Sequence, residues 1–256
     1  YILMERNGVH IINLEETLTG LKKAQDFLSQ VIKKNGEVLF VGTKKQAKDI
    51  VQQEADRCGM FYVVERWLGG TLTNYSTIKK SIKRLQLLEK EGSSIYQNLT
   101  KKEIQMLNRE RVKLADQHRG IKDMRRVPDV LVVVDANFES TAVQEALRLE
   151  IPVIAIVDSN TDPSLVSHVI PANDDSIRTI QLILSALTNT ILSAQVKDVD
   201  KQNDKVKDSE SPKKNAHPEL KKSVNSEEEV SLDDKEENAK DSSDGRDKTN
   251  DEVESD

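Results

Sequence analysis

The sequence has little of several residue types, and each shortage excludes a class of protein. Its 256 residues include a single cysteine, Cys58, so no disulfide can form within the chain, which fits a reducing compartment. Aromatic residues make up 4% of the chain, so a hydrophobic core must be mainly aliphatic. We find no signal peptide and no apolar run long enough to span a bilayer. We therefore expect a cytoplasmic protein with no membrane partner.

Motifs for metals and nucleotides are also lacking. The histidines have no metal-ligand spacing with one another or with Cys58, so we expect no metal site. The turn at residues 42–46 places Lys44 and Lys45 before a predicted helix, where a phosphate could bind. It has neither the P-loop spacing nor the dinucleotide glycine pattern. We expect a solvated turn there, with contact to an RNA backbone as the alternative.

Two aspartates, Asp135 and Asp158, follow apolar strands, where α/β enzymes place catalytic groups. No nucleophile–base pair accompanies them, and aspartates at such positions commonly form turns and cap helices. We therefore expect no enzyme activity, no cofactor and no small-molecule substrate. An α/β enzyme or nucleotide-binding module that uses these aspartates and the turn at Lys44 and Lys45 is the alternative hypothesis.

The charge of the chain is unevenly distributed. The formal net charge is −6, but residues 66–126 contain 15 lysines and arginines against 6 aspartates and glutamates. Residues 196–256 contain 12 basic and 20 acidic residues and few apolar ones. We predict that this acidic tail is disordered, because it cannot bury enough apolar surface to offset the entropy of ordering. The basic segment predicts a localised surface for a polyanion.

Short apolar runs alternate with amphipathic stretches on both sides of the basic segment. The runs predict strands at residues 9–13, 38–41, 61–64, 130–134, 152–157 and 166–170. The amphipathic stretches predict helices at 14–34, 44–57, 140–149 and 175–192. This alternation is typical of a doubly wound, Rossmann- or flavodoxin-like α/β domain with a parallel sheet. We assign residues 1–65 and 127–195 to that domain.

The basic segment is predicted to be an insertion into this domain. Residues 77–90 and 100–118 each have a narrow apolar stripe at helical spacing, and Thr100 with Glu103 forms a capping-box pattern. Two such stripes joined by a turn predict an antiparallel coiled-coil hairpin. An arm for protein–protein contact is an alternative use of such a hairpin.

The sequence RWLGGTLTN at residues 66–74 comes just before this hairpin. Adjacent glycines allow close backbone approach, and threonine and asparagine can donate to phosphate or sugar oxygens. From composition alone, a hinge that supports the hairpin and a loop that contacts RNA are equally good interpretations.

Several motifs together resemble the bacterial-type family of ribosomal small-subunit protein two. They are RWLGGTLTN followed by TIKKSI at 77–82, MERNGVHIINL at 4–14, FVGTKKQA at 40–47, LTKKE at 99–103, IKDM at 121–124, IPV at 151–153, DSNTDP at 158–163 and IPANDDSIR at 170–178. The likeness covers residues 1–192. Two departures are a missing upstream segment rich in glycine, histidine and phenylalanine, and Arg125 and Arg126 where family members often have glycines.

The resemblance implies a structural protein without catalytic activity that is seated on small-subunit ribosomal RNA among other ribosomal proteins. It also implies a role in attaching the messenger-binding ribosomal protein one, and a bacterial rather than organellar ribosome. Combining it with the charge pattern, we expect the hairpin and the adjoining loop to bind the RNA. The candidate residues are Lys44, Lys45, Arg66, Trp67, Gly69, Gly70, Thr73, Asn74, Lys79, Lys80, Lys83, Arg84, Arg109, Arg111 and Lys113.

Overall fold

The computed structural model describes residues 1–90, 96 and 99–208. It contains a five-stranded parallel sheet in the order β4-β3-β5-β6-β7. Its strands are β3 (Val38–Val41), β4 (Phe61–Val63), β5 (Val130–Val134), β6 (Val153–Val157) and β7 (His168–Pro171). In chain order within the sheet this is 2-1-3-4-5, the flavodoxin-like form of the doubly wound fold. The predicted α/β class with a parallel sheet is confirmed.

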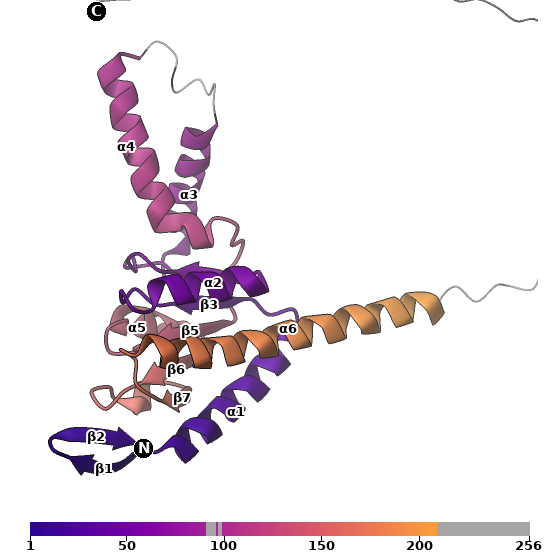
Figure 1. The fold of residues 1–256 in the computed structure, drawn as a ribbon. Helices are drawn as coiled ribbons and strands as arrows, with labels where there is room; N and C mark the ends of the chain where they lie inside the picture. The colour runs from indigo at the N-terminus through magenta and orange to yellow at the C-terminus, as the bar shows by residue number, and fades with distance from the viewer. Residues whose placement is uncertain (91–95, 97–98, 209–256) are drawn as a thin grey trace, which may run out of the picture. The chain divides into compact units, whose positions relative to one another are not determined.

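Alternate residues of the strands supply two hydrophobic clusters, one on each face of the sheet. Phe40 and Val132 face the cluster that contains α1 (Leu14–Ile32), α2 (Lys48–Cys58) and α6 (Ile177–Asp208). Leu39 and Leu131 face the cluster that contains α5 (Ser140–Arg148) and the loop after β4. Because both faces are covered, the strands are continuously apolar rather than alternating, which is why their sequence pattern was easy to recognise (Figure 1).

The closing helix is longer than predicted. The sequence pattern ended it at residue 192, whereas α6 extends to Asp208, so the tail predicted to be disordered from residue 196 begins as a helix. The remaining part of that prediction, residues 209–256, lies outside the described residues. Between Ile177 and Val196, α6 is long and apolar enough to cross a membrane by length and composition, contrary to our assessment of the apolar runs. Its buried residues, such as Leu184 and Leu187, pack in the core, as expected for the core helix of a globular domain.

The first predicted strand lies outside the parallel sheet. It corresponds to β2 (Val9–Ile12), which pairs antiparallel with β1 (Ile2–Arg6), a strand that we did not predict. A turn with Asn7 and Gly8 at positive φ joins them, as expected for an Asn-Gly hairpin turn. The error arose because the apolar residues of residues 2–6 stay exposed, so burial did not shape their pattern.

Two helices, α3 (Tyr75–Glu89) and α4 (Lys101–His118), pack against each other (Figure 1). The segment Arg119–Ile121, directly after α4, contacts β4. The capping box predicted at Thr100 and Glu103 is present. Gly120, just after α4, allows the chain to pass close to the backbone of β4, because a Cβ at that position would lie 2.2 Å from the carbonyl oxygen of Tyr62. The coiled-coil geometry stays a prediction, and the turn predicted between the helices lies mostly outside the described residues.

Within the helix pair, His118 is buried and makes a hydrogen bond of 2.9 Å with Ser81, while its Nδ1 has no partner among the described residues. Burial lowers the pKa of His118, because the charged imidazolium is poorly solvated there. Below pH 6.5, the ordinary pKa of histidine, the His118 imidazole takes up a proton in the unfolded chain but remains neutral in the folded protein until the pH is lower. Stability should consequently decrease as pH falls below that value.

We expect His118→Gln to reduce this acid sensitivity by up to about 1 kcal/mol between pH 7.5 and 5.5, measured by urea unfolding at both pH values. Burial also lowers the pKa of His168, so some acid sensitivity should remain in the variant. His10→Gln, at an exposed position, serves as the control. An unchanged pH dependence in His118→Gln would contradict this assignment.

Candidate nucleic-acid interface

The loop that follows β4 is folded around one buried carboxylate, that of Glu145 on α5. Oε1 of Glu145 accepts hydrogen bonds from Nε1 of Trp67 at 3.1 Å and from the backbone N–H of Gly70 at 2.7 Å. Oε2 accepts from the backbone N–H groups of Leu72 at 2.9 Å and Thr73 at 3.1 Å, and from the Thr73 hydroxyl at 3.2 Å. Burial by itself would raise the pKa of Glu145, but these hydrogen bonds hold it below its usual range.

This arrangement bears on the predicted RNA contacts in the loop. The indole N–H of Trp67 and the backbone N–H groups of Gly70 and Thr73 point to Glu145, so these donors are engaged within the protein. Gly70 has a φ of +88°, a conformation that favours glycine and turns its N–H toward the carboxylate. Gly69 is exposed and has open space around it. The geometry therefore favours the hinge interpretation for these donors.

Asn74 and Arg66 stand at the two ends of the same loop. The side-chain oxygen of Asn74 accepts hydrogen bonds from the hydroxyls of Ser76 at 3.2 Å and Thr77 at 2.9 Å, next to the start of α3. Arg66 is exposed, and no ion pair forms at its guanidinium within the described part of the chain. Of the predicted loop residues, Arg66 is the one that offers an available charge.

Glu145 was not among the residues predicted from the sequence, although a signal for it was present. It is a charged residue at a position of α5 that faces inward, between Val143 and Ala146, which are both buried. A charged residue is almost never fully buried without partners, so its position on the apolar face predicts hydrogen-bond donors nearby. The sequence could not identify those donors, because they come from a segment more than 70 residues away.

Lys44 is also engaged within the protein. Its Nζ lies 2.7 Å from Asp135, 2.8 Å from Asp174 and 3.0 Å from Asp175. Burial alone would lower the pKa of Lys44, but the hydrogen bonds to the three carboxylates raise it above its usual range. The amino group is thus fixed in its charged form at the carboxyl ends of the strands. Lys45, the neighbouring candidate, is exposed.

This lysine–carboxylate cluster occupies the place where doubly wound folds bind small ligands. The strand order changes direction between β3 and β5, and ligands of such folds bind beyond the carboxyl ends of the strands at that point. Here the ammonium group of Lys44 occupies it, and Oδ1 of Asp135 caps the following turn by accepting from the N–H groups of Asn137 and Phe138. Oδ1 of Asp158 accepts from the N–H of Ser159. In the described ranges, no group of histidines, cysteines or acids could hold a metal ion.

Most of the predicted cations of the helix pair are exposed. Arg84 is the exception: its Nε and Nη2 lie 3.1 and 3.3 Å from the carboxylate of Glu110, an ion pair between α3 and α4. The other cations of the pair have no ion-pair partner among the described residues. They are Lys79, Lys80, Lys83, Lys101, Lys102, Arg109, Arg111 and Lys113.

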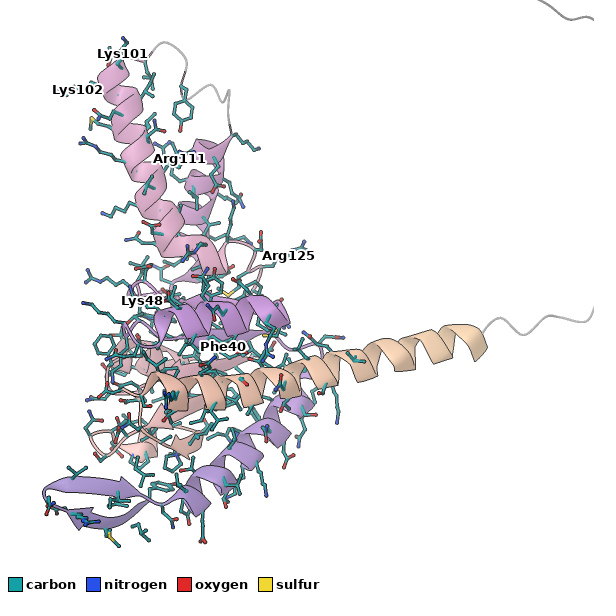
Figure 2. The ribbon with its side chains drawn as sticks, viewed as in Figure 1. Phe40, Lys48, Lys101, Lys102, Arg111 and Arg125 are labelled. Atoms are coloured by element: carbon teal, nitrogen blue, oxygen red, sulfur yellow. The ribbon has the colours of Figure 1, made fainter. Side chains whose placement is uncertain are left out.

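Figure 2 shows Lys101 and Lys102 at the end of α4 farthest from the sheet, with Arg111 farther along the helix toward it. Arg125, after α4, is a further exposed cation and was not among the candidates predicted from the sequence. Its neighbour Arg126 is paired instead with Asp129, at 2.9 Å. Exposed positive charge therefore extends along α4 and into the segment that follows it.

A groove brings the loop and α4 together. It has a volume of about 640 Å³ and lies between the exposed face of α4 and the segment after β4. Arg66, Arg109 and Lys113 all line it, although Arg66 is far from the other two in the sequence. We call it the α4 groove. Three of the predicted RNA-binding cations thus share one concave surface.

Comparison with known proteins identifies the family of the chain. The family model described as "Ribosomal protein S2" matches residues 1–194. Proteins named "Small ribosomal subunit protein uS2" are similar to the chain: that of Chlorobium phaeovibrioides is 50% identical over 203 residues, covering 79% of each protein. That of Coxiella burnetii is 50% identical over 214 residues, covering 81% of this chain and 68% of the relative. That of Acidobacterium capsulatum is 48% identical over 203 residues, covering 79% of this chain and 67% of the relative. The chain belongs to the ribosomal protein S2 family.

Proposed function

We propose that this chain is a structural protein of the small ribosomal subunit that binds ribosomal RNA through the exposed cations of α3 and α4 and the adjoining Arg66. Membership of the family makes it a non-enzymatic component of the ribosome. Its bacterial relatives favour a bacterial cytoplasm as its location. The observation that supports the RNA contact best is the row of exposed cations without ion-pair partners among the described residues of the helix pair.

The mechanism is electrostatic docking. Each lysine or arginine that approaches a phosphate releases condensed counterions, so affinity falls steeply as salt rises. An RNA helix is read mostly by its shape and backbone, which suits a protein whose surface offers charge more than aromatic stacking groups. The α/β domain holds the two helices in place through Gly120 and through Ile78 and Ile82, which are buried in the core.

The candidate residues divide into two roles. Lys45, Arg66 and the exposed lysines and arginines of α3 and α4 contact phosphates. Lys44, Trp67, Gly70 and Thr73 hold the surface in shape through the buried carboxylates they contact, and Arg84 holds α3 against α4. Gly69 and Asn74 belong to the loop that presents Arg66.

The four-fold substitution of Lys79, Lys83, Arg109 and Arg111 by alanine tests the placement of the interface. We expect the slope of log affinity against log salt to flatten by roughly 0.7–0.9 for each phosphate that is no longer neutralised, measured with a small-subunit RNA fragment. Neutralising Lys22, Lys23, Lys33 and Lys34 on and after α1 gives a control with the same change in charge. An unchanged slope in the first variant would place the interface elsewhere.

Docking of the messenger-binding ribosomal protein one is part of the proposal. It rests on the family resemblance alone, and we assign no residues to it. Sedimentation of a lysate on a sucrose gradient tests both the association with the small subunit and the docking of protein one. The chain should move with small subunits at low salt and leave them in a high-salt wash, and depletion of the chain should remove protein one from the subunits. A chain that stays at the top of the gradient at low salt would contradict the ribosomal function.

A further inference from the structure

The α4 groove contains more than a phosphate site requires. Besides its cations, it is lined by the amide side chains of Gln105, Asn108 and Gln117. No hydrogen bond engages these amides within the part of the chain that the structure describes. An amide side chain offers both a donor and an acceptor, which is the pattern needed to pair with the edge of a base. Asparagine and glutamine also bond to phosphate and sugar oxygens, so discrimination between bases is the property that distinguishes base contact from backbone contact.

The remaining lining residues extend this pattern. Val112 is 55% exposed, so it offers an apolar surface beside the amides on the outer face of α4. Glu65 also lines the groove, but its carboxylate is held by Lys48 at 2.7 Å. Asp116 has no ion-pair partner among the described residues, so its carboxylate can accept a hydrogen bond from an amino group of a ligand. The groove therefore joins positive charge, amide groups, one acidic acceptor and an aliphatic surface.

We propose that the α4 groove binds one unpaired nucleotide of an RNA loop or bulge. Its phosphate lies against Arg66, Arg109 and Lys113, and the edge of its base faces Gln105 and Asn108. This inference rests on the proposed function and names the RNA feature that the site recognises. Within an A-form helix the Watson–Crick edge of a base is paired and the major groove is too deep and narrow for side chains to read, whereas an unstacked base presents that edge and can lie against the α4 groove.

The same chemistry gives a preference among bases. Asparagine and glutamine pair with the edge of adenine through two hydrogen bonds, and a carboxylate accepts from an exocyclic amino group. The side-chain oxygens of Gln105 and Asn108 can accept from such an amino group, which adenine and cytosine carry on that edge and uracil lacks. The groove should therefore favour an unpaired adenine over an unpaired uracil.

The experiment uses the full chain and three RNA hairpins that share one stem: a perfect stem, a stem with one bulged adenine, and a stem with one bulged uracil. Dissociation constants are measured by fluorescence anisotropy over a range of salt. We expect the bulged adenine to be bound about tenfold more tightly than the perfect stem, with the bulged uracil between them. In the variant Gln105→Ala with Asn108→Ala this preference should fall to about twofold or less, with affinity for the perfect stem and its salt slope unchanged.

Gln86→Ala is the matched control, because Gln86 is an exposed amide on α3 that does not line the groove. It should keep the preference for the bulged adenine, and circular dichroism should show all variants folded. Equal affinity of the wild-type chain for the three RNAs, or a preference that survives the double substitution, would overturn the proposal. Salt-dependent binding of the perfect stem would still support the proposed function, whereas no binding of any RNA at low salt would overturn both.

Discussion

Replacing Glu145 by alanine is expected to destabilise the domain by about 3–5 kcal/mol, because five hydrogen-bond donations lose their acceptor at a buried site. Hydrogen bonds to charged groups are among the stronger ones, and the buried donors that remain cannot all reach water. Urea unfolding followed by circular dichroism measures the loss. Trp67, the one tryptophan of the chain, reports on the loop directly, and its fluorescence should shift to the red in the variant.

Gln144→Ala, an exposed substitution on the same helix, is the control and should change stability by less than about 0.5 kcal/mol. The wild-type contribution of Glu145 should also depend on pH with a definite sign. Because its pKa is lowered in the folded state, the stabilisation is present above the ordinary value of 4.5 and is lost as pH falls through the lowered pKa. A loss under about 1 kcal/mol with unchanged fluorescence of Trp67 would show that the loop folds independently of Glu145.

The second large effect is expected at Lys44. The substitution Lys44→Met keeps an apolar side chain of similar length but removes the cation that lies between Asp135, Asp174 and Asp175. Asp135 and Asp174 are 3% and 1% exposed, so their charges would remain buried without compensation. Breaking a buried ion pair from one side typically costs about 3–5 kcal/mol. We expect a loss of that size at pH 8, measured by urea unfolding.

The pH dependence of this variant distinguishes a charge effect from a packing effect. Burial already raises the pKa of Asp174, and removal of Lys44 should raise it further. A carboxyl group whose folded pKa is raised gains stability as pH falls toward its unfolded value, because the folded state takes up the proton first. The deficit of Lys44→Met should therefore be smaller at pH 5 than at pH 8.

The double variant of Lys44→Met with Asp174→Asn provides the control for this cluster. It removes one of the uncompensated charges and should recover part of the lost stability, which is the interaction that a double-mutant cycle measures. Equal deficits at pH 5 and pH 8, without recovery in the double variant, would mean that Lys44 acts through packing alone. RNA affinity should remain largely unchanged in the folded fraction, because the proposed function assigns Lys44 a supporting role and no contact with the RNA.

The two clusters explain how a fold that commonly binds small ligands can serve as a scaffold here. At the carboxyl ends of the strands, the ammonium group of Lys44 occupies the usual ligand position, and the carboxylate of Glu145 fixes the loop that leads into α3. The ion pairs of Lys44 and the hydrogen bonds of Glu145 form inside the protein, so the surrounding surface stays free for contact with a macromolecule. The rigid loop then presents Arg66 to the groove beside α4.

Local patterns in the sequence were sufficient for most of the secondary structure. The run at β5 is continuously apolar because both faces of the sheet are covered. Helix α4 begins just after Thr100, because the side chains of Thr100 and Glu103 each accept a hydrogen bond from the other's backbone N–H. Each of these features depends on residues within a few positions of one another. The unequal charge of residues 66–126 likewise pointed to a basic surface without knowledge of the fold.

What the tertiary structure decided concerns residues that are distant in the chain. Lys44 was expected in a solvated turn or in contact with an RNA backbone, because its partners Asp174 and Asp175 lie 130 and 131 residues further on and the sequence does not show that they pair with it. The donors of the 66–74 loop looked available for RNA because the sequence does not show that Glu145 faces them. Helix propensity and hydrophobic periodicity are short-range properties, whereas the occupancy of a charge or a hydrogen-bond donor depends on which distant group packing brings within about 3 Å. The sequence therefore determined the elements and the sign of the surface charge, and only the packing decided which of those charges remain free to bind.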